Sequence, residues 1–474
     1  MHPVEALTER QRAFAFHTLL VVLVLEIVDM TIVNTALGAI RVDLGAAASQ
    51  CQWIVAGYSL CFAMFLLLGG RLGDLLGGRT MFLGGVGAFT AASLLCGLAT
   101  TPSLLIGARM LQGATGAMMA PQVMTMIQHL YSPVERIGRM AWFGVVGGLA
   151  AILGPILGGL LIAANPMGLG WRLVFLVNVP IGIMAVIAGS MLLPHTPLHT
   201  ERRVDALGAV TFAAAMFALL YSLMQAESQG ATPATFAWLA LAAGLFVIGW
   251  RSQVRRKAEG RAFLVDVAVF GNATFLRALL ISLSFSAANT GFLFVYAYAL
   301  QNELGMSSLR TGLMHMPFSA GVMFGMAVLG RRYIATHGRI VLIGGAALLA
   351  AGSVAALGWT AWGPGAPVAV LVPVLAVAGC GMGLISGPIG SVAVARIERT
   401  QAGSASGTLK TVQQMGSALG VAIAGSAYLL MAPGGRGHGQ VGAGIAIGLL
   451  LLVCAGIALQ LPRVIFPPAR PAAG

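Results

Sequence analysis

The chain has 474 residues and a net charge of +13, and 58% of its residues are hydrophobic while only 9% are charged. Soluble domains carry about 25% charged residues, so this composition excludes an ordinary soluble globular protein. A membrane-spanning helix needs about 20 apolar residues, so the apolar content can fill on the order of fourteen spans and predicts a polytopic membrane protein.

Apolar stretches of spanning length follow one another along the whole chain. They lie at about 14–40, 52–70, 80–99, 103–127, 140–163, 171–193, 205–226, 235–250, 274–300, 311–330, 339–360, 367–392, 404–431 and 441–461. Each stretch is continuous and rich in Leu, Ala, Gly and Val, whereas the strands of a membrane barrel alternate over about ten residues. The sequence therefore predicts an all-α fold with about 14 transmembrane helices.

The basic residues indicate the orientation of these spans. If the N-terminus is cytoplasmic, 20 of the 27 Lys and Arg fall in cytoplasmic loops, four fall in outer loops, and three (Arg109, Arg277 and Lys410) fall within or at the ends of spans. Cytoplasmic loops of membrane proteins collect Lys and Arg. This bias predicts that both termini are cytoplasmic, and it explains the positive charge without a nucleic-acid partner.

A faint internal repeat suggests how the spans are grouped. The loops at 70–79 and 330–339 share Gly-Arg at both ends, and each separates two spans. Transporters are commonly built from repeated bundles. We therefore expect an N-terminal six-helix bundle at 1–200, two inserted transmembrane helices and a basic cytoplasmic loop at 201–262, and a C-terminal six-helix bundle at 263–474.

The first span contains two acids, Glu26 and Asp29, near the middle of the membrane. At spacing i, i+3 they share one helix face. An ionised acid at that depth costs roughly 2.5–3.5 kcal/mol on insertion scales, so it usually faces a cavity or a partner. Two like charges on one face favour reversible protonation, which coupling to a proton gradient requires. A static pair that only hydrogen-bonds neighbouring helices is the alternative.

The loop at 70–79 contains Gly70, Asp74, Gly77 and Arg79. Its glycines allow a tight cytoplasmic turn, and Asp74 can cap a helix or pair with an Arg elsewhere. A solvated loop without a special role is the alternative. A phosphate-binding loop is disfavoured because no Lys-Ser/Thr follows.

The fourth span contains the cation that matches these acids, Arg109, with Gln112 one turn later on the same face. A mobile Arg that responds to the acids is favoured, because this span contains no acid of its own; a static Arg bonded to carbonyl groups is the alternative. In the fifth span, Gly154, Pro155, Gly158 and Gly159 form a smooth, bent face that admits another helix, although generic tight packing explains that run equally well.

No pattern in the chain indicates an enzyme or a metal site. The eight His residues are scattered, and the five Cys residues lack the paired spacing of zinc or redox sites. Neither an H-E-x-x-H motif nor a nucleophile elbow occurs. We therefore expect no catalytic residues, no metal and no cofactor, with a proton gradient as the energy source.

Four motifs together resemble the major facilitator superfamily, specifically its fourteen-span drug:proton antiporters. The segment Asp29-Met-Thr31-Ile-Val-Asn34 resembles D-x-T-x-x-N, Gly70-x-Leu72-x-Asp74-x-x-Gly77-x-Arg79 resembles G-x-L-x-D-x-x-G-R, Arg109-x-x-Gln112-Gly113 resembles R-x-x-Q-G, and Gly154-Pro155-x-x-Gly158-Gly159 resembles G-P-x-x-G-G. Trp171-Arg172, Asn178-x-Pro180-x-Gly182 and Gln301 also look like this subfamily. Gly38 departs from it, because many relatives have Pro there, and Glu26 is not part of the shared signature.

The resemblance implies alternating access between two six-helix bundles. Asp29 and Arg109 are expected in proton coupling, together with Glu26. Glu26, Asn34 and Gln112 are expected to line the substrate cavity. The residues Gly70, Asp74, Gly77 and Arg79 would form a cytoplasmic gate, and the Gly154-Pro155 helix would lie at the bundle interface.

The sequence thus predicts a proton-coupled exporter of amphipathic, including cationic, drugs or toxic compounds in the cell membrane. An exporter of a specific metabolite or siderophore is the main alternative, followed by an uptake symporter and a non-transporting membrane sensor. The expected partners are a small-molecule substrate and the lipid bilayer. A periplasmic adaptor and an outer-membrane channel are left open.

Overall fold

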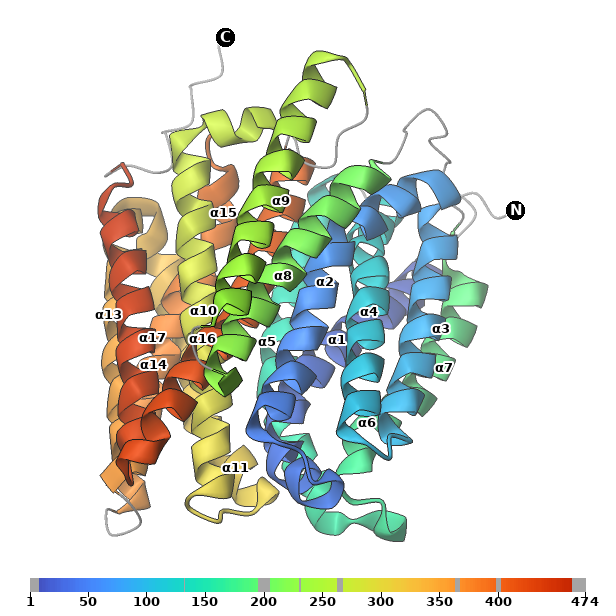
Figure 1. Cartoon of the computed structure of the whole chain (residues 1–474). Helices are drawn as coiled ribbons and strands as arrows, with labels where there is room; N and C mark the ends of the chain where they lie inside the picture. Colours follow the sequence, from blue (N-terminus) through green and yellow to red (C-terminus); the bar gives the residue numbers. More distant parts are fainter. Residues whose placement is uncertain are drawn as a thin grey trace. The chain divides into compact units, whose positions relative to one another are not determined.

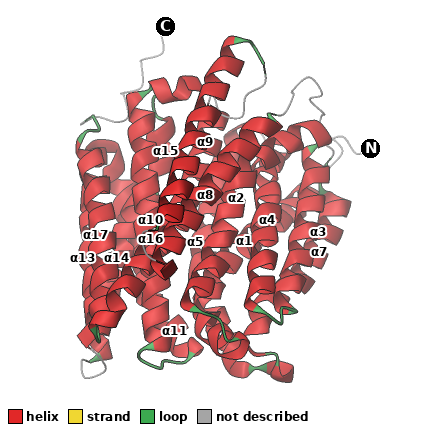
Figure 2. Ribbon diagram, in the orientation of Figure 1, coloured by secondary structure: helices red, strands yellow, loops and turns green. Residues whose placement is uncertain are grey.

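Helices account for all the regular structure that can be described. The computed structural model describes residues 8–131, 133–194, 205–229, 232–261, 267–362, 367–397 and 402–462. These ranges contain helices and no strand (Figure 2). The predicted all-α fold is confirmed for this part of the chain.

The chain forms two compact units, and α10 (Ala273–Asn302) contributes to both. The first unit comprises Met1–Leu264 and Leu293–Met316 and the second comprises Val265–Phe292 and Pro317–Gly474. Helices of the first unit are α1 (Glu9–Leu44), α2 (Ala48–Leu76), α3 (Gly78–Gly97), α4 (Pro102–Leu130), α5 (Pro133–Ala164), α6 (Leu173–Leu176), α7 (Asn178–Leu192), α8 (Ala206–Gln229), α9 (Pro233–Ala258) and α11 (Ser308–Met314) (Figure 1). The second unit contains α12 (Met316–Phe324), α13 (Arg331–Trp362), α14 (Leu371–Ser386), α15 (Ile389–Val394), α16 (Ala402–Met431) and α17 (His438–Leu459).

Ten helical segments among the described residues are long and apolar enough to cross a membrane. The helices α2, α4, α5 and α8, which cover four further predicted spans, are not among these ten. The predicted count of fourteen spans is therefore not confirmed. That count, the cytoplasmic termini and the three-part division at 1–200, 201–262 and 263–474 stay predictions.

Local sequence signals explain where several helices begin and end. The Thr8 side chain caps the first turn of α1, and Gln11 completes a capping box. At the other end of α1, Gly45 adopts a left-handed backbone with φ 63°, which a glycine tolerates. Thr101 caps α4 directly before Pro102, a residue suited to a first helical position. These caps satisfy backbone groups that a helix end leaves unpaired.

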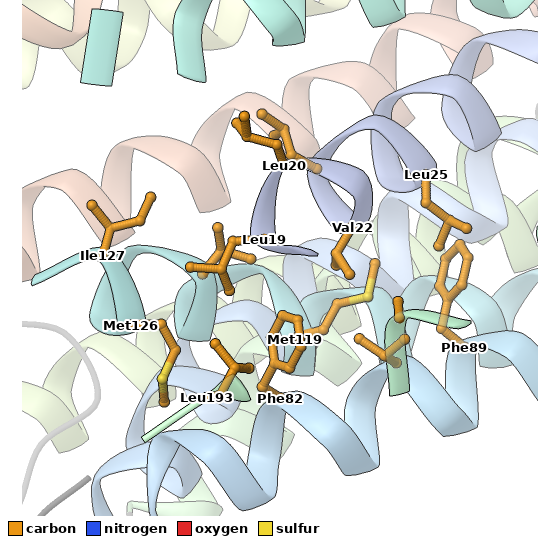
Figure 3. Close-up of a cluster of buried hydrophobic side chains, with 14 of the residues drawn as sticks. Leu19, Leu20, Val22, Leu25, Phe82, Phe89, Met119, Met126, Ile127 and Leu193 are labelled. Atoms are coloured by element: carbon orange, nitrogen blue, oxygen red, sulfur yellow. The ribbon is translucent and has the colours of Figure 1, made fainter. Parts of the chain in front are cut away.

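Apolar packing in the first unit joins the inner faces of α1, α3 and α4. Figure 3 shows α1 residues Leu19 and Val22 among side chains of the other two helices, including Phe82 and Met119. These four side chains are at least nine-tenths buried. Lipid tails are as apolar as these side chains, so close dispersion contacts, and not removal from water, hold α1 against its neighbours.

Glycines bring α2 and α4 very close together. A Cβ at Gly113 would overlap the backbone of Tyr58, and a Cβ at Gly69 would lie 2.5 Å from the carbonyl oxygen of Ala117. Small residues let helices in a membrane approach and gain dispersion contacts. In the second unit Gly291 allows a similar close approach of α10 to α16, since a Cβ at Gly291 would lie 2.6 Å from the carbonyl oxygen of Gly420.

Helices α8 and α9 form a pair that is tied at both ends. The buried Asp205 accepts hydrogen bonds from the backbone N–H of Gly208 at 2.9 Å and from Gln253 Nε2 at 2.6 Å, and it pairs with Arg256 at 3.3 Å. At the opposite end, Ser222 Oγ donates to the Thr235 carbonyl at 2.8 Å. These contacts make α8 and α9 one antiparallel hairpin.

Replacing Asp205 tests the tie between these two helices. The Asp205→Ala variant leaves the Gly208 N–H and the Gln253 amide without their acceptor, so we expect the free energy of unfolding to fall by about 2–4 kcal/mol. Thermal unfolding of the purified protein in detergent measures this loss. The surface substitution Glu259→Ala is the control, and an equal loss in both variants would contradict the assignment.

Candidate functional site

The predicted acid and cation of the first unit meet in a buried ion pair. Arg109 Nη1 on α4 lies 2.6 Å from Asp29 Oδ2 on α1. The Asp29 side chain is 0% exposed and the Arg109 side chain is 1% exposed. An ion pair at this depth survives only when further hydrogen bonds satisfy both charges, because its desolvation is costly.

Amide side chains supply those further bonds to Asp29. Gln112 Nε2 and Asn178 Nδ2 each donate to Asp29 Oδ1 at 2.8 Å. The same two nitrogens also donate to Ser93 Oγ, at 3.1 and 3.0 Å. Asp29 therefore receives donors from α4 and α7 at once, and Ser93 on α3 closes the network.

The charge of Arg109 is satisfied by acceptors and by aromatic rings. Its Nη1 donates to Gln112 Oε1 at 2.8 Å, and its Nε donates to the Ile54 carbonyl of α2 at 3.3 Å. The guanidinium carbon lies 4.3 Å from the ring centroid of Tyr58 and 5.7 Å from that of Phe175. A ring face attracts a cation most strongly where water is excluded.

This arrangement closes Asp29 off from water in the observed state. Every hydrogen bond described above joins groups inside the unit, which is the static arrangement that the sequence left open beside the proton-coupling role. Exchange of a proton with solvent therefore requires a state in which water reaches the Asp29 carboxyl group. The proton-coupling roles of Asp29, Arg109 and Glu26 stay predictions.

Glu26 lies one turn before Asp29 on α1 and is 4% exposed. The i, i+3 spacing places the two acids on one face of α1, as the sequence predicts. Like charges in a low dielectric repel strongly, so coupling between the two acids stays a prediction.

The other two residues expected to line a cavity have different surroundings. Gln112 is 0% exposed, and its amide is engaged with Asp29, Arg109 and Ser93. Asn34 is 9% exposed, and its side-chain oxygen is buried with no hydrogen-bond partner among the described residues. Their predicted contact with a substrate is untested.

The predicted cytoplasmic gate is described only in part. Gly77 separates α2 from α3 with φ 87°, a backbone conformation that favours glycine. Arg79 donates to the carbonyl of Ser190 at the end of α7. Gly70 faces Pro121 of α4, since a Cβ at Gly70 would lie 3.9 Å from Pro121 Cβ. The side chain of Asp74 lies outside the described residues.

The glycine run of α5 fits between two helices. A Cβ at Gly154 or Gly158 would overlap Thr31 or Thr35 of α1, so these positions face α1. A Cβ at Gly159 would lie 2.7 Å from Leu309 Cα on α11. Facing it, a Cβ at Gly312 of α11 would overlap the backbone of Pro155. The run therefore meets threonine side chains on the α1 side and backbone atoms on the α11 side, and both sides leave little room for a larger residue.

Sequence reasoning missed Ser93 and Tyr58 as members of the buried network. A Ser in an apolar span usually satisfies its hydroxyl on its own helix, so Ser93 carries little signal. Tyr58 lies in an equally apolar stretch, where an aromatic residue predicts core packing and gives no sign of a contact with a cation. Asn178 was noted only as a subfamily feature, although an amide at membrane depth needs a partner.

Comparisons with known proteins place the chain among transporters. The family model described as Major Facilitator Superfamily matches residues 19–421. The chain is 36% identical to the "Probable actinorhodin transporter" of Streptomyces coelicolor, over 85% of this chain and 70% of that protein. It is 32% identical to the "Tetracenomycin C resistance and export protein" of Streptomyces glaucescens, with 84% and 72% covered.

Two further proteins show similarity over nearly the whole chain. The chain is 30% identical to the "Putative multidrug resistance protein MdtD" of Salmonella typhi, over 92% of this chain and 91% of that protein. A bacterial homologue of the human lysosomal transporter Spinster, solved in an inward-facing and occupied conformation, aligns with a TM-score of 0.67 and 14% identity. That alignment covers 95% of this chain and 97% of the other, and it shows the fold alone.

A double substitution measures the buried ion pair. The Asp29→Ala variant leaves a buried guanidinium without a counter-charge, which costs about 3–5 kcal/mol of unfolding free energy. The double variant Asp29→Ala/Arg109→Leu removes the orphaned charge, so we expect it to be more stable than Asp29→Ala alone. Thermal unfolding in detergent compares the variants. A double variant as unstable as the sum of its single losses would contradict the pairing.

A bulky residue in the glycine run tests the close contact between α1 and α5. A leucine side chain at position 158 must displace Thr35 and Ile32. We therefore expect Gly158→Leu to lower the free energy of unfolding by about 1–3 kcal/mol, the cost of overpacking a core. Gly107→Leu on α4 is the control, because nothing lies within 4 Å of a Cβ there. The unfolding temperatures of the two variants in detergent are compared. If Gly158→Leu is as stable as Gly107→Leu, the contact is not close.

Proposed function

The chain belongs to the Major Facilitator Superfamily, and on that premise we propose that it exports amphipathic antibiotic-like compounds from the cell in exchange for protons. Membership in this family makes it a multi-pass transporter of the plasma membrane and not an enzyme. Export as the direction of transport is supported by relatives that are named for the export of tetracenomycin C and for multidrug resistance.

The observation that carries the proton part of the proposal is the enclosed Asp29–Arg109 pair. The Asp29 carboxyl group in this position can be ionised or protonated. When ionised it binds Arg109, and when protonated it loses that Coulomb attraction while Gln112 and Asn178 still donate to its carbonyl oxygen. Protonation thus weakens the hold on Arg109 while Oδ1 keeps both of its donors, and the new O–H requires an acceptor of its own.

The free energy that a proton gradient supplies is comparable to the cost of separating Asp29 from Arg109. Breaking a buried pair costs about 3–5 kcal/mol. A proton that crosses 100 mV supplies about 2.3 kcal/mol, and each pH unit of gradient adds about 1.4 kcal/mol. The gradient is thus of the size needed to separate Asp29 from Arg109 once per cycle. No cofactor is required in this scheme.

We assign recognition of the compound to Glu26 and Asn34, with Gln112 as the residue that couples recognition to Asp29. The unsatisfied side-chain oxygen of Asn34 supports this role, because a polar group of a compound or a water molecule can donate to it. The buried acid Glu26 suits a cationic group on the compound.

The remaining parts of the scheme follow the sequence. We propose fourteen spans with cytoplasmic termini, grouped as six, two and six, because 20 basic residues then lie in cytoplasmic loops. Asp74 would act with Gly70, Gly77 and Arg79 at the cytoplasmic gate.

An exporter of one specific metabolite is the second candidate function. It is favoured by relatives that are named for single compounds, actinorhodin and tetracenomycin C. A siderophore exporter belongs to the same class. The two candidates differ in the width of the substrate range, so one panel of compounds separates them.

Accumulation in cells tests the export function. Cells with and without the protein are loaded with tetracenomycin C, actinorhodin or the cationic dye ethidium. We expect lower accumulation of at least one of these compounds in cells that contain the protein, and we expect an uncoupler to abolish the difference. Export of only one of the three compounds supports the exporter of a single metabolite. A difference that survives the uncoupler contradicts proton coupling.

Proton release in inside-out vesicles tests the role of Asp29. Addition of an exported compound should release protons in the unmodified protein, and Asp29→Asn should abolish that release because its amide carries no ionisable proton. Glu9→Gln, an exposed acid on the same helix, is the control. Glu26→Gln shows whether Glu26 is the main proton carrier instead. Compound-driven proton release that persists in Asp29→Asn would reject the assignment.

A further inference from the structure

The last turn of α10 makes polar contacts with α1 that the proposed function does not use. Gln301 Nε2 donates to the carbonyl oxygen of Asn34 at 2.9 Å. Gln301 Oε1 accepts from the backbone N–H of Gly38 at 2.7 Å. One side-chain amide therefore engages two backbone groups of α1, and all three residues belong to the first unit.

These two backbone groups are natural partners of each other. In an α-helix the N–H of residue 38 pairs with the carbonyl of residue 34. With Gln301 in place its amide bridges the two groups, and when it leaves they can bond each other as in a regular helix. A buried backbone group without any partner is costly. Gln301 can therefore leave and return without creating such a group on α1.

The residue at position 38 makes this contact possible. A Cβ on Gly38 would lie 2.6 Å from Gln301 Oε1 and 3.0 Å from Gln301 Cβ. Both distances are shorter than ordinary van der Waals contact, so any larger residue would displace the amide. Glycine here leaves the space that the Gln301 side chain fills.

A second contact lies one turn further along α1. Arg41 Nη1 donates to Asn302 Oδ1 at 2.9 Å, and the Arg41 guanidinium carbon lies 5.6 Å from the ring centroid of Tyr298. Asn302 is held in turn by its own bond to the Tyr298 carbonyl at 3.1 Å. Gly38 and Arg41 share a face of α1, so consecutive residues at the end of α10 bind one stripe of that helix.

We propose that Gln301 is a positioning residue of the transport cycle. Gln301 and Asn302 of α10 with Gly38 and Arg41 of α1 form what we name the α1–α10 clasp, which opens and closes once per cycle. The contacts suit a reversible device, because Gln301 and Asn302 are neutral and the backbone groups of α1 that bind Gln301 can pair with each other when it leaves. The inference rests on the proposed transport function, since α1 also carries Asp29.

A disulfide across the clasp tests whether it must open. In the Gly38→Cys/Gln301→Cys variant the Cβ atoms start about 3.0 Å apart, a little below the 3.5–4.5 Å of disulfides, so a small shift allows the bond. Oxidation in membranes should form the disulfide, as mass spectrometry of the digested protein shows. Oxidised protein should stop exporting the compound found in the accumulation assay, and reduction should restore export. Each single Cys variant, oxidised in the same way, is the control.

The outcomes of the disulfide experiment separate the clasp from the proposed function. Failure of the disulfide to form would overturn the clasp, and so would unchanged export with the disulfide formed. Absence of export in the unmodified protein would overturn the proposed function instead. Because mass spectrometry needs no export, the contact between α1 and α10 is measured even then.

Substitutions that remove the same contact provide a second measurement. Gln301→Ala removes the amide, and Gly38→Ala displaces it, so each should change maximal export by about fivefold, the size of one or two neutral hydrogen bonds. The double variant should show no further change, because both substitutions remove one interaction. Gln301→Glu retains an acceptor for the Gly38 N–H and should recover part of the activity. Additive effects, or losses that only follow the unfolding temperature, would overturn the proposal.

Discussion

The structure depends on a charged pair that has been taken out of water. Asp29 and Arg109 are enclosed by side chains of α2, α3, α4 and α7, and their hydrogen-bonding groups are met by Gln112, Asn178 and the Ile54 carbonyl. Such a pair contributes little net stability, yet removal of one partner is costly. The first unit therefore encloses an ion pair whose strength depends on the charges of Asp29 and Arg109.

Helix α1 links the features of this unit. Asp29 lies near its middle, Thr31 and Thr35 meet the glycines of α5, and Gly38 meets Gln301 of α10. Because the helix is hydrogen-bonded along its whole length, a shift at one of these points moves the others. Packed glycine contacts change between discrete arrangements and do not deform smoothly. A change of charge at Asp29 can thus alter contacts two turns away.

Much of the fold and part of the site could be predicted from the sequence. Long apolar stretches leave the backbone few choices in lipid, so helices were predictable. The approach of Asp29 to Arg109 followed from opposite charges at similar membrane depth. The surroundings of Glu26 and Gln112 were not predictable, because helix rotation decides whether a polar side chain faces a cavity or a neighbouring helix. The contact of Gln301 with Gly38 was not predictable either. Gln301 bonds backbone groups of α1, and every residue type carries such groups, so no sequence pattern indicates the contact.

We propose that Asp29 gains and loses a proton although it is enclosed in the observed state. Infrared difference spectroscopy of the purified protein in lipid measures this directly, because a protonated carboxyl has a carbonyl stretch that a carboxylate lacks. We predict a carboxyl band that appears as the pH is lowered and is absent in Asp29→Asn. A spectrum without such a band throughout the pH range of export would show that Asp29 stays ionised, as a fixed structural partner of Arg109.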